Sequence, residues 1–149
     1  MQEQLEQAAG QLDDLVAAIA AHRADLYLYR YDPTDMLAHN YLPAWNGNGT
    51  IARRSPFFSA YDYLDRRLSD VVAAMDADDV LLLLSDHGTQ NSANHDRRAV
   101  YVAAGVGVVP HRVDGISIEH VPSYLAALLC VQDPWKLPIV VGAIPDGCR

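Results

Sequence analysis

Hydrophobic positions near the start of the chain recur at helical spacing. Between Gln2 and His22 the apolar residues fall three or four positions apart, interrupted by Gly10, and this predicts an amphipathic helix over 2–22. The segment "DLYLYRY" (25–31) is apolar on both faces up to Arg30 and predicts a strand that Pro33 closes. A helix followed directly by a strand is the first indication of a layered fold.

A long stretch without regular periodicity follows the predicted strand. It reads "DPTDMLAHNYLPAWNGNGTIARRSP" (32–56) and is rich in Gly, Asn and Pro. Unstructured connections of this length in compact domains usually serve function. We therefore expect a structureless loop here, and the first functional residues within it.

Patterned segments resume at Ser55, which is a good helix N-cap because Pro56 follows it. An apolar stripe from Phe58 to Met75 then predicts a second long helix. The remaining patterns predict a central strand, another strand, a short helix and a last strand, at 80–84, 99–105, 122–129 and 137–144.

This alternation of helices and strands predicts an α/β fold with a mostly parallel sheet and flanking helices. With 149 residues, half of them hydrophobic, the chain can form one domain with a core of its own. No helical pattern separates Ser85 from Val100, whereas a parallel crossover needs a helix. Strand 99–105 is therefore predicted to run antiparallel to strand 80–84, which makes the sheet a mixed one.

Charge and hydropathy restrict the partners. The formal net charge is −8 and the arginines are scattered or in pairs, so we expect no nucleic-acid partner. A small anion held by a metal stays compatible with this charge. We see neither an apolar run of about 20 residues nor a signal-peptide pattern, so we expect a soluble chain without a membrane partner, and its localisation is left open. The two cysteines match no metal or redox spacing.

Acidic and imidazole side chains follow the ends of two predicted strands. Asp35 and His39 come after strand 25–31, whereas Asp86, His87 and then His95 come after strand 80–84. Ligands of α/β sheets gather at the carboxyl ends of parallel strands, so these five side chains are expected at one rim. They are ligands of divalent metals such as zinc, with manganese or iron as alternatives. Five ligands exceed what one tetrahedral zinc with a bound water needs, which implies a second ion.

Other polar residues have simpler interpretations. Gly88 is expected to give the backbone the freedom to splay the two preceding ligands. Five further residues are interpreted as ordinary polar or solvated side chains: His22, His111, His120, Asp62 and Asp65. Three residues beside the predicted ligands are candidates for orienting them: Asn91, Asn94 and Asp96.

Four segments carry a family resemblance: "TDMLAHNYLP", "LLLLSDHGT", "HDRRAVYVAAGVGV" and "SIEHVPSYLAALLCV". In this order they resemble the carboxyl half of the alkaline phosphatase superfamily, closest to its type I phosphodiesterase and nucleotide pyrophosphatase branch. In that family a D-x-x-x-H pair, an S-D-H-G motif and a later His before a strand bind two zinc ions. The resemblance implies that Asp35, His39 and His95 hold one zinc, and that Asp86 and His87 help to hold the other.

By this resemblance the intact enzyme is a metal-dependent hydrolase of small phosphate esters, acting through a Thr or Ser nucleophile. That family places the nucleophile and a further metal-binding Asp well upstream of the D-x-x-x-H pair. Thr34 and Ser85 adjoin the ligands here, but neither opens a helix after a strand. We therefore expect residues 1–149 to be the carboxyl portion of a larger enzyme, lacking the amino-terminal part of the sheet and weakly active or inactive alone.

Some positions depart from the family pattern and keep alternatives open. Ala38 stands where the family usually has Gly, and "GVG" (105–107) stands where it has Gly-Pro-Gly. The "TDMLAH" segment is close to its counterpart in cofactor-independent phosphoglycerate mutases, so a mutase-like enzyme is one alternative. A non-catalytic metal-binding remnant is another. A sulfatase lacks support, because neither cysteine lies in a C-x-P-x-R context.

Overall fold

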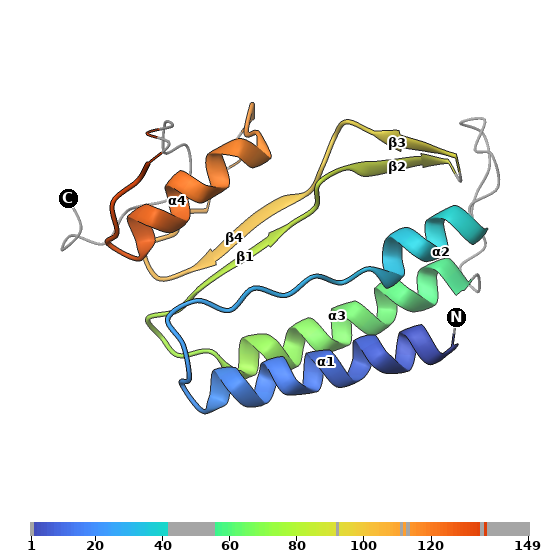
Figure 1. Ribbon diagram of the computed structural model, residues 1–149, viewed down its shortest axis with the longest axis horizontal. Helices are drawn as coiled ribbons and strands as arrows, with labels where there is room; N and C mark the ends of the chain where they lie inside the picture. Colours follow the sequence, from blue (N-terminus) through green and yellow to red (C-terminus); the bar gives the residue numbers. More distant parts are fainter. Residues whose placement is uncertain are drawn as a thin grey trace. The chain divides into compact units, whose positions relative to one another are not determined.

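The computed structural model describes residues 2–41, 56–91, 93–110, 112, 114–134 and 136. The chain folds into two compact units. The first comprises Met1–Met75 and His87–Ala99, and the second comprises Asp76–Asp86 and Val100–Arg149. Figure 1 labels the helices and strands of both units.

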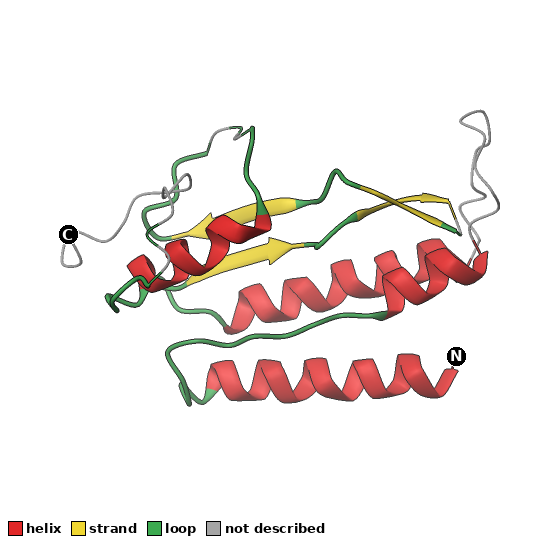
Figure 2. Cartoon of the chain, turned by 45° about the horizontal axis from the view of Figure 1, so that its top comes forward, coloured by secondary structure: helices red, strands yellow, loops and turns green. Residues whose placement is uncertain are grey.

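Two long helices form the base of the first unit. They are α1 (Gln2–Ala20) and α3 (Pro56–Ala74), and they lie side by side (Figures 1 and 2). Both were predicted from the spacing of apolar residues, and both are confirmed. Leu12 and Ile19 of α1 and Val71 of α3 are buried, as expected where each amphipathic helix turns its apolar side inward.

A third helix, α2 (Pro33–Tyr41), occupies part of the segment predicted to be a structureless loop. That prediction is wrong for these nine residues. Pro33 takes the first helical position, where its missing N–H costs nothing, and the Asp32 carbonyl oxygen accepts the first backbone hydrogen bonds. Leu37 and Ala38 are only 2% and 1% exposed, so burial against the other helices stabilises a helix too short to stand alone. Residues 42–55 of the predicted loop lie outside the described part.

The predicted strand 25–31 is extended but has no ladder partner among the described residues, so this prediction is wrong. Its side chains do alternate, since Tyr27, Tyr29 and Tyr31 are half-buried while Leu28 is 90% exposed. The tyrosine hydroxyls make contacts that a sheet would otherwise provide. Tyr27 Oη donates to the carbonyl oxygen of Ala18 at 2.9 Å, and Tyr31 Oη donates to a carbonyl oxygen of α3.

The second unit contains β1 (Val80–Leu84) and β4 (Tyr101–Gly105), paired antiparallel from Val80 opposite Gly105 to Leu84 opposite Tyr101. The two strands and their antiparallel direction confirm the prediction. Within the described residues β1 pairs on one edge only, and its side chains are half-buried except that of Leu84, which is exposed. Gly105 has φ +126°, and a Cβ there would come 2.1 Å from the carbonyl oxygen of Asp79, so this turn needs glycine.

The unit also contains the 3-10 helix η1 (Ile118–His120) and α4 (Val121–Leu128), which confirms the predicted short helix. Ser117 caps η1, and the Nδ1 atom of His120 accepts a hydrogen bond from the Ser117 N–H at 3.0 Å. His120 thus has the local structural role of a capping residue. Cys130, just after α4, is disulfide-bonded.

A second antiparallel pair lies in the first unit and consists of β2 (Gly88–Asn91) and β3 (Asn94–Asp96). Sequence patterning missed this hairpin, because its residues are polar on both faces. The α/β class is correct, but both sheets of the described residues are two-stranded and antiparallel, so the predicted mostly parallel sheet is not found there. The predicted strand 137–144 lies outside the described residues. Among the described helices, none has the length and apolar character required to cross a bilayer.

Candidate metal centre

Helix α2 brings Asp35 and His39 onto one face, one turn apart. The Oδ1 atom of Asp35 lies 3.5 Å from the Nε2 atom of His39. Their positions suit the helix, since an acidic side chain is favourable in the first turn and a basic one in the last. The D-x-x-x-H spacing therefore places the two side chains on one helix face, and a structureless loop would not have done so.

The β2–β3 hairpin carries the other two imidazoles. His87 immediately precedes β2, and His95 lies in β3 opposite Thr89. Gly88 allows the two strands to approach, because an added Cβ would come 2.3 Å from the carbonyl oxygen of Arg98. Its φ is not positive, so close approach, and not the expected backbone freedom, explains the glycine.

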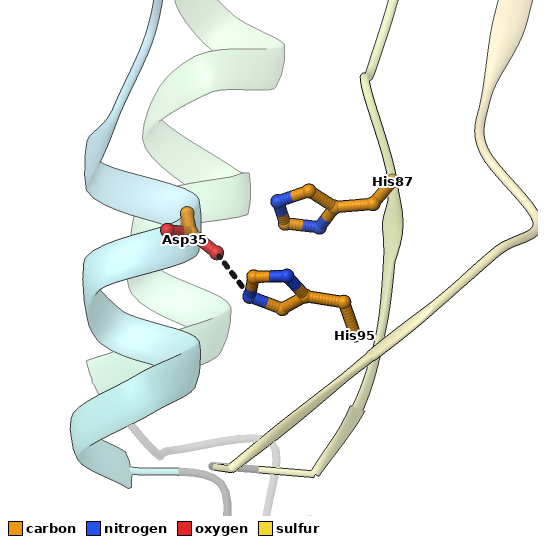
Figure 3. Close-up of side chains that lie close together, drawn as sticks. All are labelled: Asp35, His87 and His95. Atoms are coloured by element: carbon orange, nitrogen blue, oxygen red, sulfur yellow. Dashed lines mark ion pairs between the residues drawn. The ribbon is translucent and has the colours of Figure 1, made fainter.

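Three atoms from these two elements form a tight triangle. The Nε2 atoms of His39 and His95 are 3.1 Å apart, and Asp35 Oδ1 lies 3.5 Å from the first and 3.9 Å from the second. Figure 3 shows His95 reaching from the hairpin toward Asp35 on α2. A tetrahedral zinc with bonds of about 2.0–2.1 Å separates its ligand atoms by about 3.3–3.4 Å. The triangle therefore approximates one face of a zinc tetrahedron, with the side between Asp35 and His95, at 3.9 Å, longer than this separation.

His87 is close to this triangle but is oriented differently. Asp35, His87 and His95 each offer an atom within 4.8 Å of the others. The rings of His87 and His95 are stacked, with centroids 3.7 Å apart and planes 8° apart (Figure 3). An imidazole nitrogen binds metal through a lone pair in the ring plane, so two parallel rings do not direct their lone pairs to one point. His87 is therefore better placed for a separate ion.

One carboxylate oxygen of Asp35 has no hydrogen bond, although two imidazoles lie within ion-pair distance of it. Its Oδ1 atom is buried and makes no hydrogen bond, although the whole side chain is 45% exposed. A buried carboxylate oxygen without a donor is costly, and a cation at this position would remove that cost. Together with the zinc-like donor spacing, this orphaned oxygen shows that the residues present fit a divalent cation.

The structure brings together four of the five predicted ligands: Asp35, His39, His87 and His95. The fifth, Asp86, is exposed and belongs to the second unit. The role of all five as metal ligands stays a prediction.

The hydroxyl side chains near the predicted ligands have different local environments. The Oγ atom of Ser85 accepts a hydrogen bond from the N–H of Val100 at 2.9 Å, which closes the end of the β1–β4 ladder. Thr34 is half-buried in the first turn of α2. Thr89, which no sequence motif singles out, lies directly opposite His95. Only the register of the β2–β3 hairpin shows that Thr89 is a neighbour of His95.

Two other residues have clear local environments. Asp96 was predicted to orient a ligand, but its carboxylate accepts hydrogen bonds from the backbone N–H and the guanidinium of Arg98 at 2.8–3.1 Å. These hydrogen bonds lower the pKa of Asp96 to about 2. On α3, burial and then the charge of Asp35 raise the pKa of Tyr61, so this phenol lies within electrostatic reach of the cluster.

Comparison with known proteins identifies the family. A family model described as the metalloenzyme superfamily matches residues 2–122, which include the five predicted ligands and the two elements that carry the triangle. No curated protein and no solved structure matched the chain. The match spans most of the sequence, and its description agrees with the donor set. The chain belongs to the metalloenzyme superfamily.

Proposed function

We propose that this chain supplies the metal-binding half of a phosphate-ester site, in which Asp35, His39 and His95 hold one zinc ion. The observation that supports the proposal most strongly is the triangle of donor atoms at 3.1, 3.5 and 3.9 Å. Manganese is the alternative ion, since it accepts the same carboxylate and imidazole donors. The orphaned oxygen of Asp35 supports the same assignment.

A second ion is proposed for Asp86 and His87. The stacking of His87 on His95 supports two ions, because parallel rings suit different ions better than one. Two neighbouring ions can hold the attacking and the leaving oxygen of a displacement at phosphorus.

The charge of the proposed first site favours anionic ligands. When bound, a divalent ion polarises a phosphoryl oxygen and lowers the pKa of a hydroxyl or water beside it. Asp35 contributes one negative charge and the imidazoles bind in their neutral form, so a site with one ion keeps a net charge of about +1. This local charge can attract a phosphate ester although the chain carries a net charge of −8.

The substrate class rests on the motifs. The ordered set D-x-x-x-H, S-D-H-G and the later His favours a phosphodiesterase or nucleotide pyrophosphatase in the intact enzyme. A phosphoglycerate-mutase-like activity is the second candidate, supported by the "TDMLAH" segment. An assay of the intact enzyme with an aryl phosphodiester and with a phosphoglycerate separates them, because only the hydrolase releases the aryl alcohol.

The metal site is tested by zinc titration of the chelator-treated 149-residue chain in a calorimeter. Wild-type protein should bind zinc, and His39→Ala should weaken binding at least about 100-fold, since even residues that only orient metal ligands contribute about 10–100-fold. His22→Asn is the matched control. His22 has φ 48°, which Asn tolerates, and His22 is not among the five predicted ligands.

Equal zinc affinity in wild type and His39→Ala would refute the assignment. Asp86→Ala reports on the second ion. It should reduce the stoichiometry measured at saturating zinc while leaving the first binding event unchanged.

A further inference from the structure

One face of the β2–β3 hairpin carries more than the two histidines. Thr89 is the register partner of His95, and residues directly opposite in an antiparallel pair point to the same face with Cβ atoms about 4.5–5.5 Å apart. His87 lies two residues before Thr89, so strand alternation puts it on that face as well. The stacking of His87 on His95 shows that the face is continuous.

This face is the one that meets the acidic side chain of α2. His95 on it reaches Asp35 at 3.9 Å (Figure 3), and its Nε2 atom lies 3.1 Å from that of His39. Thr89 is half-buried beside them. Its position precedes the irregularity between Thr89 and Asn91, so the regular register holds there. A hydroxyl is thus positioned next to the ligand triangle by backbone pairing alone.

We propose that Thr89 is a ligand-binding residue of this site, whose hydroxyl donates a hydrogen bond to an oxygen of a phosphate group held on the metal ion. The proposal rests on the proposed function, since it requires a metal ion in the triangle. Three protein ligands leave the fourth tetrahedral position open. A phosphate oxygen there would place its neighbouring oxygens within reach of a side chain adjacent to His95.

The chemistry of the residue suits this role. A threonine hydroxyl provides one donor and can rotate to meet a phosphate oxygen. A hydrogen bond to a charged acceptor contributes more to binding than one between neutral groups. A purely structural role would use only the shape of Thr89, because β-branched side chains favour strands. Valine has that shape without the hydroxyl, so the two roles can be separated.

The test measures binding of inorganic phosphate to the cobalt-loaded 149-residue chain. Cobalt(II) takes the place of zinc, and its visible absorption reports first on metal binding and then on phosphate joining the ion. Four proteins are compared: wild type, Thr89→Val, Thr89→Ser and Gln90→Ala. Gln90 is the exposed neighbour of Thr89 on the same strand and controls for disturbance of the hairpin.

Thr89→Val should bind cobalt with unchanged affinity and bind phosphate about tenfold or more weakly, the size expected for a lost hydrogen bond to a charged group. Thr89→Ser should restore phosphate affinity, and Gln90→Ala should match wild type. Equal phosphate affinity in wild type and Thr89→Val would overturn the proposal while leaving the metal site intact. A wild-type chain that binds no cobalt would overturn the proposed function, and this inference with it.

Discussion

Gly88 lies at the first residue of β2, where the hairpin strands come closest to the Arg98 backbone. An added Cβ would stand 2.3 Å from the carbonyl oxygen of Arg98 and 3.3 Å from the Cβ of Asp96. Gly88→Ala should therefore open the hairpin and destabilise the fold by about 1–3 kcal/mol, the usual cost of forcing extra atoms into a packed position. Urea unfolding followed by circular dichroism measures this change.

Gly10 offers the matched control for that substitution. It lies inside α1, and a Cβ there would meet nothing within 4 Å. Gly10→Ala should stabilise the protein by about 0.5–1 kcal/mol, because alanine is the better helix former. If both alanine variants change stability equally and in the same direction, close approach at Gly88 is not the reason for the glycine.

The residue types and their spacing were enough to predict most of the candidate site. Asp35 and His39 were selected by the D-x-x-x-H pattern, and His87 and His95 by their place after a strand. The sequence could not show that Asp86 and His87, which are adjacent in the chain, fall in different units. It also gave no sign of Thr89, because cross-strand register depends on where the hairpin turns.

Helices and strands differed in how well the sequence predicted them. Helices α1 and α3 carry long amphipathic patterns and were predicted almost to the residue. Helix α2 was not predicted, because it has only nine residues and their polarity is mixed. Its structure depends on the burial of Leu37 and Ala38. Residues 25–31, which are apolar on both faces up to Arg30, are extended as a strand prediction requires. Pairing depends on neighbouring strands, and no local pattern contains that information.

Tyr31 ties the extended segment to α3, donating to the carbonyl oxygen of Ala60 at 3.4 Å. Burial, and then the neighbouring phenols of Tyr63 and Tyr29, raise its pKa from 10.0 to about 12. The native protein thus holds this proton where the unfolded chain releases it. The contribution of the protonated Tyr31 phenol to the free energy of unfolding is complete below pH 10, and it is lost as the pH rises from about 10 to 12.

Tyr31→Phe should flatten that alkaline decline, because the titrating group is gone. Free energies of unfolding at pH 9, 10.5 and 11.5 measure the slope in both proteins. Tyr31→Phe should also cost a little stability at pH 9 through the lost hydrogen bond, about 0.5–1.5 kcal/mol at most. An identical slope in the two proteins would show that Tyr31 does not retain its proton.

Arg67 joins α3 to α1. Its guanidinium contacts Asp13 of α1, and it reaches Asp70 of its own helix at 2.6 Å, with the arginine side chain 22% exposed. An isolated surface ion pair contributes about 0–1 kcal/mol, whereas this arginine bridges two carboxylates and is mostly buried. Arg67→Ala should destabilise the protein by about 1–2 kcal/mol in chemical unfolding.

The adjacent, exposed Arg66 gives the control for this variant. Arg66→Ala should change the free energy of unfolding by less than about 0.5 kcal/mol, as is usual for surface substitutions. Loss of equal size in both variants would mean that general charge, and not the bridge between helices, determines the effect.

The molecule is organised as two units, and within the described residues each unit has one two-stranded antiparallel sheet. The predicted sheet is larger and mostly parallel, because strand-like segments alternate with helical ones along the chain. In the second unit several apolar side chains are more than 40% exposed, including Val100, Val102 and Val109. A two-stranded sheet cannot bury the side chains on both of its faces. Predicting the number of strands from the hydrophobicity of their residues therefore gave too large a sheet for the described residues.

Metal should stabilise the folded molecule, since the ligands come from two elements that meet only in the native state. At a free zinc concentration of 100 times Kd, binding to the native state adds about 2.7 kcal/mol to the free energy of unfolding. For a chain of this size, that should raise Tm by several degrees. Melting curves with zinc and with excess chelator measure the shift. Identical curves would mean that zinc does not bind the native state preferentially.

The central claim, that Asp35, His39 and His95 hold one divalent ion, is tested most directly by anomalous diffraction at the zinc edge from crystals of the full chain grown with zinc. The account predicts a peak about 2.0–2.2 Å from Asp35 Oδ1 and from the Nε2 atoms of His39 and His95. A zinc-bound structure in which these three atoms do not share one peak, or in which the only peak lies elsewhere, would contradict it.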